Sequence, residues 1–139
     1  MSGDYVLDAW CLLALLQAEE SADSRVRQLL QAAERQQATL SVSIINLGEV
    51  YYRVGRVKGR DEAEDTLENI RGLPLMVLPA TDDMVFAAAR LKVDHSISYA
   101  DAFAAAAAHE RKAVLVTGDP ELLQLDGDVR VERLHRHGR

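Results

Sequence analysis

The stretch that best indicates the fold of this chain is Val114-Leu115-Val116-Thr117-Gly118-Asp119-Pro120. Its apolar, β-branched start predicts a buried strand. Asp119 followed by Pro120 predicts the N-terminus of a helix, with proline in the first helical position. Tyr5-Val6-Leu7-Asp8 repeats the order of apolar run and acid near the start of the chain. Because ligands of open α/β sheets bind beyond the carboxyl ends of the strands, acids placed in this way can converge on one site.

Apolar runs alternate with helical patterns along the whole chain. This alternation predicts an α/β fold with a mainly parallel central sheet of about five strands, covered by helices on both faces. We expect strands over Tyr5 to Leu7, Leu40 to Ile44, Leu75 to Leu78, Val114 to Val116 and Val129 to Leu134. We expect helices over Ala9 to Gln17, Ser24 to Gln37, Leu47 to Val57, Asp61 to Gly72, Asp83 to Asp94 and Tyr99 to Arg111. The alanine-rich stretch from Ala102 to Ala108 predicts a helix that packs closely on its neighbours.

Composition narrows the class of protein. A chain of 139 residues, with 48% hydrophobic and 27% charged residues, is typical of one globular domain. The N-terminus has no basic start and its first apolar run ends at Asp8, so we expect neither a signal peptide nor a membrane span, and a cytoplasmic location. Cys11 is the single cysteine, which excludes a disulfide framework within the chain and favours a packing role. The four histidines form no metal-binding pattern.

Four acidic residues stand out by position. Asp8, Glu49, Asp101 and Asp119 each lie where an apolar run gives way to a helix, or in the first turn of a helix. Carboxylate oxygens gathered in this way suit Mg²⁺ or Mn²⁺. Crowded carboxylates also repel one another, so we expect at least one of them to have a raised pKa when no metal is bound.

Each of these acids also has a purely structural interpretation. Asp8 and Asp119 fit N-caps, Ser98-x-x-Asp101 fits a capping box, and Glu49 lies three residues after Asn46, as a reciprocal capping acid does. It is the set of four that favours a cation site. Spacing alone does not exclude two further acids that follow an apolar run, Asp82 and Asp83.

At these four acids the chain resembles PIN-domain ribonucleases, and more narrowly the VapC-type toxins of bacterial toxin–antitoxin pairs. The resemblance covers nearly the whole chain. The matching segments are Tyr5-Val6-Leu7-Asp8-Ala9, Asn46-Leu47-Gly48-Glu49-Val50, Ser98-Tyr99-Ala100-Asp101-Ala102-Phe103-Ala104-Ala105-Ala106 and Leu115-Val116-Thr117-Gly118-Asp119-Pro120-Glu121-Leu122. One position departs from the pattern, because Trp10 stands where the family often has Ser or Thr. A hydroxyl that could hold a metal-bound water is therefore missing.

The resemblance implies a single PIN-like nuclease domain over residues 1–134, followed by a basic tail over residues 135–139. Its activity would be that of a Mg²⁺- or Mn²⁺-dependent endoribonuclease, in which the four acids hold one or two ions and metal-activated water cleaves structured RNA such as tRNA or rRNA. Thr117 would orient Asp119 or a bound water. A homodimer and a cognate antitoxin are also implied, with the antitoxin bound in an apolar groove. Candidates for lining that groove are Leu12, Leu15 and Leu16, which fit a core role equally well.

Charge bears on how RNA would bind. The net charge of −6 disfavours a general nucleic-acid binder, but a divalent ion would bring local positive charge to an acidic pocket. The expected RNA-binding residues are Arg53, Arg56, Lys58 and Arg60, which fit a solvated helix end equally well. Arg130, Arg133, Arg136 and Arg139 make the C-terminal end basic. Aromatic residues are 5% of the chain and form no cluster, so an aromatic platform for base stacking is not expected.

Two other classes of function stay open at this point. A phospho-acceptor signalling domain also groups acids around Mg²⁺, but it would carry a Lys after a late strand, and none follows Val116 here. A PIN-like module without catalysis, binding only RNA or a partner, would not need all four acids.

Overall fold

The computed structural model describes residues 3–18 and 22–135 and is built on a five-stranded sheet. The strand order is β3-β2-β1-β4-β5, and every neighbouring pair is parallel, as the sequence predicts. The strands are β1 (Gly3–Leu7), β2 (Ala38–Ser43), β3 (Met76–Leu78), β4 (Val114–Thr117) and β5 (Val131–Arg133). The chain first extends the sheet to one side of β1 and then returns to the other side with β4. The carboxyl ends of β1 and β4 therefore lie at the point where the strand order reverses.

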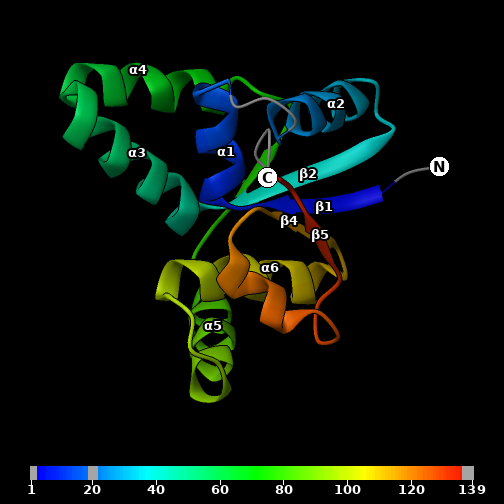
Figure 1. The fold of residues 1–139 in the computed structure, drawn as a ribbon. Coiled ribbons are helices and arrows are strands. Elements are labelled where there is room, and N and C mark those ends of the chain that lie inside the picture. The colour runs from blue at the N-terminus through cyan, green and yellow to red at the C-terminus, as the bar shows by residue number, and fades with distance from the viewer. Residues whose placement is uncertain (1–2, 19–21, 136–139) are drawn as a thin grey trace.

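Helices cover both faces of the sheet, which confirms the α/β prediction (Figure 1). The helices are α1 (Ala9–Leu16), α2 (Ala22–Glu34), α3 (Ile44–Lys58), α4 (Arg60–Arg71), α5 (Asp82–Asp94), α6 (Tyr99–Arg111) and the 3-10 helix η1 (Pro120–Leu125). In Figure 1, α1 and α2 lie on one face, α5 and α6 lie on the other, and α3 and α4 form an antiparallel pair at one end. No helix in the described ranges is long and apolar enough to cross a membrane.

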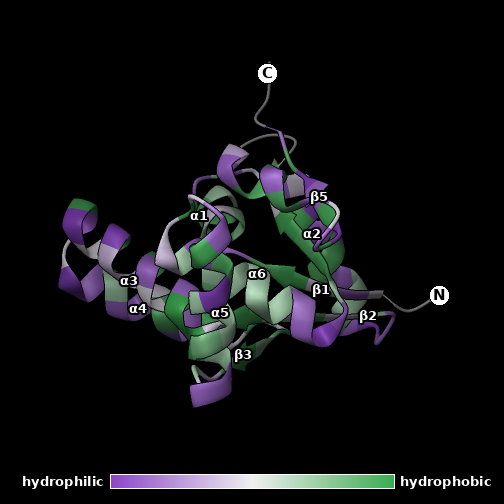
Figure 2. Ribbon diagram, turned by 90° about the horizontal axis from the view of Figure 1, so that it is seen from below, coloured by the Kyte–Doolittle hydropathy of each residue, from purple (hydrophilic) through white to green (hydrophobic). Residues whose placement is uncertain are grey.

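Two buried clusters hold these layers together. Successive residues of a strand face opposite sides of the sheet, so Leu7 packs in the cluster under α1 and α2, whereas Val6 packs in the cluster under α6. Cys11 is fully buried in the first cluster, where its Sγ donates a hydrogen bond to the carbonyl oxygen of Val116, in keeping with its expected packing role. Figure 2 shows the hydrophobic residues concentrated in the strands and many hydrophilic residues along α3 and α4.

Several predicted boundaries differ from the observed ones by one to three residues, and the start of α3 is the one that bears on the site. Helix α3 begins at Ile44 and not at Leu47, because the Ser43 side chain accepts a hydrogen bond from the backbone N–H of Ile45 and caps the helix. Ile44 therefore does not belong to the strand, and Asn46 is not a cap. Asn46 is instead fully buried, and its Nδ2 donates to the carbonyl oxygen of Ala100 at 3.0 Å. This bond ties the start of α3 to the start of α6.

Candidate functional site

All four acids singled out from the sequence line one small pocket of about 80 Å³. Its lining residues are Asp8, Ala9, Trp10, Leu13, Glu49, Arg53, Asp101 and Asp119. These residues come from the start of α1, from α3, from the first turn of α6 and from the segment after β4. The pocket thus lies beyond the carboxyl ends of β1 and β4, where the strand order reverses.

Asp8 and Asp119 are joined through Thr117. Asp8 caps α1, since its Oδ1 accepts a hydrogen bond from the backbone N–H of Cys11 at 3.0 Å. Its Oδ2 accepts a hydrogen bond from the Thr117 hydroxyl, and that hydroxyl accepts one from the backbone N–H of Asp119 at 2.9 Å. Burial raises the pKa of Asp8 to about 6, although the bonds from Thr117 and Cys11 lower it. The buried Thr117 hydroxyl therefore links Asp8, which follows β1, to Asp119, which follows β4.

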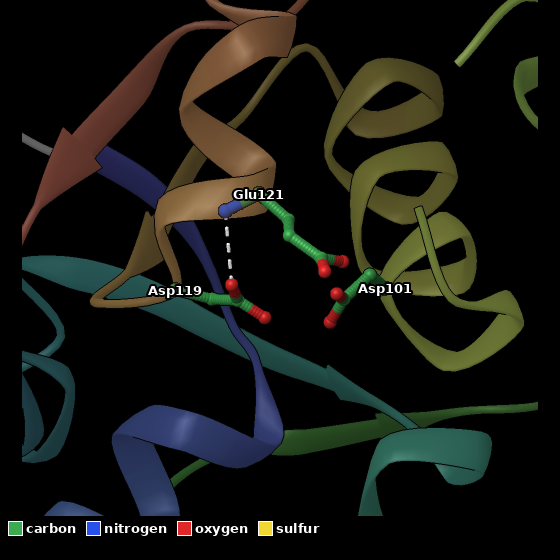
Figure 3. A group of neighbouring side chains, drawn as sticks. All are labelled: Asp101, Asp119 and Glu121. Carbon is green, nitrogen blue, oxygen red and sulfur yellow. Dashed lines mark hydrogen bonds between the residues drawn. The ribbon is translucent and has the colours of Figure 1, made fainter. Parts of the chain in front are cut away.

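Asp101, Asp119 and Glu121 form a close trio of carboxylates. One oxygen from each lies within 4.8 Å of the others, and Figure 3 shows the Asp101 and Glu121 side chains reaching toward the same space beside Asp119. Asp119 caps η1 as predicted, because its Oδ1 accepts the backbone N–H of Glu121 at 3.0 Å. Glu121 lies in the last of the segments that resemble the PIN family, but the sequence argument did not assign it to the site. An acid two residues after a capping Asp is a common feature of helix starts, so no signal in the sequence distinguished it.

Asp101 is the most strongly perturbed of the pocket acids. Its pKa is raised to about 7, mainly by burial and also by a hydrogen bond with Asp119 and by the charges of Asp119 and Asp8, while a hydrogen bond with Ser98 lowers it. The expectation of a raised carboxylate pKa is confirmed, and burial is a larger cause than mutual repulsion. The backbone N–H of Asp101 donates to Ser98 Oγ at 3.1 Å, as the capping motif predicts.

Glu49 lies in the same pocket but outside the trio. Its Oε2 accepts a hydrogen bond from Arg53 Nε at 3.0 Å, one helical turn further along α3. Arg53 therefore places one positively charged side chain in the wall of a pocket that is lined by four acids. Asp82 and Asp83, which spacing alone did not exclude, are exposed in the first turn of α5 and take no part in the pocket.

The donor set fits a hard divalent cation. The trio and the pocket offer carboxylate oxygens, with no imidazole or thiolate among the lining side chains. Such oxygen-only sets suit Mg²⁺ and Mn²⁺ and do not suit softer metals. Burial is the main cause of the raised pKa values of Asp8 and Asp101, since it leaves their negative charges without full compensation from solvent. A bound cation would supply that compensation.

A larger groove of about 350 Å³ lies next to this pocket, between α1 and α3. It is lined by Leu13, Leu16, Gln17, Arg53, Val54, Arg56, Val57 and Lys58. Of the three leucines considered from the sequence, Leu12 is fully buried core, Leu15 is half-buried against that core, and only Leu16 lines the groove. Arg53 lines both the groove and the acidic pocket.

Three of the four expected RNA-binding cations line this groove, and Arg60 does not. Of the basic residues near the C-terminus, Arg130 donates a hydrogen bond to the carbonyl oxygen of Lys112, and Arg133 is exposed on β5. Arg136 and Arg139 lie outside the described residues.

A family model described as the PIN domain matches residues 5–128. The chain belongs to the PIN-domain family. The match includes both central strands of the sheet and every acid of the pocket and the trio. No curated protein matches the sequence of this PIN domain.

Solved structures share this fold at low sequence identity. A VapBC complex from Rickettsia felis, bound to a DNA fragment from its promoter, superposes with a TM-score of 0.73 at 20% identity, covering 95% of this chain and 99% of that one. A DNA-bound VapBC complex from Salmonella typhimurium gives 0.72 at 18% identity, with coverages of 94% and 98%. The sarcin-ricin loop cleaving toxin VapC20 of Mycobacterium tuberculosis gives 0.64 at 17%, with coverages of 80% and 86%.

Proposed function

We propose that this PIN domain is a Mg²⁺- or Mn²⁺-dependent endoribonuclease that acts in the cytoplasm as the toxin of a toxin–antitoxin pair. The observation that carries the proposal is the convergence of four acids, from distant parts of the sequence, on one pocket beyond β1 and β4. A phospho-acceptor domain would not belong to the PIN family, whose model matches this chain.

Asp101, Asp119, Asp8 and Glu49 would hold the cation, directly or through water, and Glu121 is close enough to join them. A divalent ion in such a site lowers the pKa of water and offsets the charge that develops on a phosphoryl group. Thr117 keeps Asp8 and Asp119 in register through its two hydrogen bonds. The raised pKa of Asp101 implies that cation binding at neutral pH releases a proton from this carboxyl group in part of the molecules.

The proposed substrate is structured RNA, such as tRNA or rRNA. Support comes from the similarity to a toxin that cleaves the sarcin-ricin loop, and from the cations beside the pocket. Arg53 lies within the pocket, while Arg56 and Lys58 continue along the groove. Guanidinium and ammonium groups bind phosphate and do not ligate cations. We infer that these three residues hold the RNA backbone and that the carboxylates perform the hydrolysis.

The groove also suits a cognate antitoxin. Leu16 is 42% exposed and Val57 is 83% exposed at its edge, beside Arg56 and Lys58. An apolar segment that carries acidic residues would match both the apolar and the basic part of this surface. Because Arg53 lines the groove and the pocket, an antitoxin bound here would compete with RNA for the same guanidinium. The resemblance to VapC-type toxins also leads us to propose a homodimer, which analytical ultracentrifugation would test.

The test of the proposed function is the chemistry of cleaved ends. Purified protein incubated with cellular RNA and Mg²⁺ should produce new 5′-phosphates, and EDTA should stop the reaction. Hydrolysis by activated water does not use the ribose 2′-hydroxyl as nucleophile. Products with 2′,3′-cyclic phosphates, or cleavage that is insensitive to EDTA, would contradict the proposal. RNA binding without any cleavage would instead support a PIN-like module that has lost catalysis.

A further inference from the structure

Trp10 is the least expected residue of the acidic pocket. It is the single tryptophan of the chain and lies in the first turn of α1, two residues after Asp8. Its side chain is half-buried, packs against the core cluster under α1, and lines the pocket together with the carboxylates and Arg53. A large aromatic surface in contact with a polar cavity loses part of the benefit of burial. The position of Trp10 thus brings part of an aromatic surface to the wall of the pocket, beside the carboxylates.

The position of the indole is set by Gly118, the residue before Asp119. A Cβ atom on Gly118 would lie 2.2 Å from Cζ2 of Trp10 and 2.4 Å from both Cε2 and Cη2. If the Cβ atom approached in the plane of the ring, Cε2 and Cη2 would lie much farther from it than Cζ2. The nearly equal distances therefore place Gly118 over the face of the ring. Only glycine permits this contact, so the backbone beside Asp119 supports the indole.

The surroundings of Trp10 favour RNA over other ligands. Carboxylates that hold a cation would place the scissile phosphate within the pocket, and Arg53 lines the same pocket. The base attached to the neighbouring ribose would then be within reach of an aromatic ring in the pocket wall. Proteins bind unpaired bases by stacking them on Phe, Tyr, Trp or His. A base in a duplex is already stacked and cannot do this.

We propose that Trp10 is a specificity-determining residue that stacks on an unpaired nucleobase next to the scissile phosphate. Cleavage would then depend on a base at one defined position beside the scissile phosphate. This inference rests on the proposed ribonuclease function. It does not require an aromatic platform, because one ring serves one base.

The first experiment measures whether the effects on KM of changing Trp10 and of removing a base depend on each other. A hairpin RNA that carries a mapped cleavage site is compared with versions in which one nucleotide near the site is abasic. At one position the loss of the base should raise KM for the wild-type protein about tenfold, since base stacking contributes about 1–3 kcal/mol. For Trp10→Leu, which keeps an apolar side chain, KM should already be raised by a similar factor, and the abasic substitution should add nothing. The value of kcat should change much less.

Controls separate stacking from folding and from the proposed function. Trp10→Phe keeps a smaller ring and should give an intermediate KM, while Mn²⁺ affinity measured by calorimetry should be unchanged in both variants. If Trp10→Leu does not fold, fluorescence of the wild type replaces it, because Trp10 is the only indole. Intact RNA should then quench its emission more strongly than the abasic RNA. The inference is wrong if the effect of the Trp10 substitution on KM adds to that of the abasic substitution at every position. It is also wrong if both RNAs quench the fluorescence equally. Neither result would contradict the proposed ribonuclease function. An absence of any RNA cleavage by the wild type would instead refute the proposed function.

Discussion

Helices α6 and α3 both bring a carboxylate to the pocket, but they are built in opposite ways. Every residue of α6 from Asp101 to Ala108 is buried, and its packing surface consists almost entirely of alanine methyl groups and Phe103. Helix α3 buries Asn46, Leu47 and Val50 near its start and exposes most of its last two turns. Asp101 thus stands on a helix enclosed by the fold, whereas Glu49 stands on a helix whose other end faces solvent.

This difference separates two tasks within one site. Small side chains let α6 approach its neighbours closely, so the position of Asp101 is set by tight packing. The exposed end of α3 is free to carry Arg53, Arg56 and Lys58, which are also favourable charges near a helix C-terminus. In the proposed function, the enclosed helix would fix the geometry of the carboxylates, while the exposed helix would bind the partner or the substrate.

The largest effect should come from the carboxylates themselves. Asp101→Asn or Asp119→Asn should reduce RNA cleavage at least about a hundredfold, because each removes a charge that the cation needs. The melting temperature of metal-free Asp101→Asn should equal or exceed that of the wild type, since its carboxyl group is unfavourably ionised in the folded state. Cleavage assays and thermal melts in EDTA check both outcomes. Asp83→Asn, at an exposed acid outside the pocket, is the matched control and should leave cleavage unchanged.

A smaller effect is expected from the exposed end of α3. Arg56→Glu combined with Lys58→Glu should weaken RNA binding about tenfold and flatten its dependence on salt, because fewer counterions are released. Affinity for Mn²⁺ without RNA should stay the same. Titrations at several salt concentrations make the measurement. Arg71→Glu with Lys92→Glu changes the net charge equally at exposed positions on α4 and α5, so RNA binding that falls equally in this control would mean a general effect of charge.

The packing of α6 predicts an effect on stability. Ala105→Leu should destabilise the fold by about 1–3 kcal/mol, because a fully buried methyl position leaves no room for a larger side chain. Val57→Leu adds volume on the exposed part of α3 and should change the unfolding free energy by less than about 0.5 kcal/mol. Urea unfolding curves of both variants give the comparison. Equal effects at the two sites would refute the idea that only α6 is tightly packed.

The smallest effect concerns pH. The folded-state pKa values of Asp8 and Asp101 are raised to about 6 and about 7 from the ordinary carboxyl value of 3.8. At pH values between the ordinary and the raised pKa, the folded state binds more protons than the unfolded state. The contribution of these two carboxyl groups to stability therefore falls as pH rises. Without metal, the melting temperature should therefore fall by several degrees from pH 5 to pH 8, relative to Asp101→Asn over the same range. Mg²⁺ should stabilise the wild type more at pH 8 than at pH 5. A wild type whose pH dependence parallels that of Asp101→Asn would show that the raised pKa of Asp101 is absent.

Much of the fold could be predicted because local signals agree with it. Asp8 and Asp119 end apolar runs, Pro120 follows a cap, and the bounds of α6 were predicted correctly from the sequence. The start of α3 was missed because Ile44 and Ile45 are β-branched and continue the strand pattern, while the capping Ser43 looks like an ordinary strand residue.

The parts of the site that could not be predicted depend on contacts between distant elements. The carboxylates of Glu121 on η1 and Asp101 on α6 lie close together only in the folded protein, and no spacing in the sequence predicts their proximity. The bridge from Thr117 to Asp8 joins two strands that are neighbours only in the folded sheet. The packing of the Trp10 ring against Gly118 is likewise a tertiary contact. Sequence patterns located four of the carboxylates, whereas Glu121 and the residues that support the site were recognised only from the folded structure.

The alanine stretch of α6 has a consequence for protein engineering. Alanine is already small, so nearly every substitution on its packed face adds volume, and little remains to be removed. Variants with new specificity are therefore best sought at Arg53, Arg56, Val57 and Trp10, where side chains meet a groove or a pocket. A library that randomised α6 would mostly yield proteins that fail to fold. For the proposed ribonuclease toxin, a library confined to the groove would instead test new RNA targets and new antitoxins while the four acids stay in place.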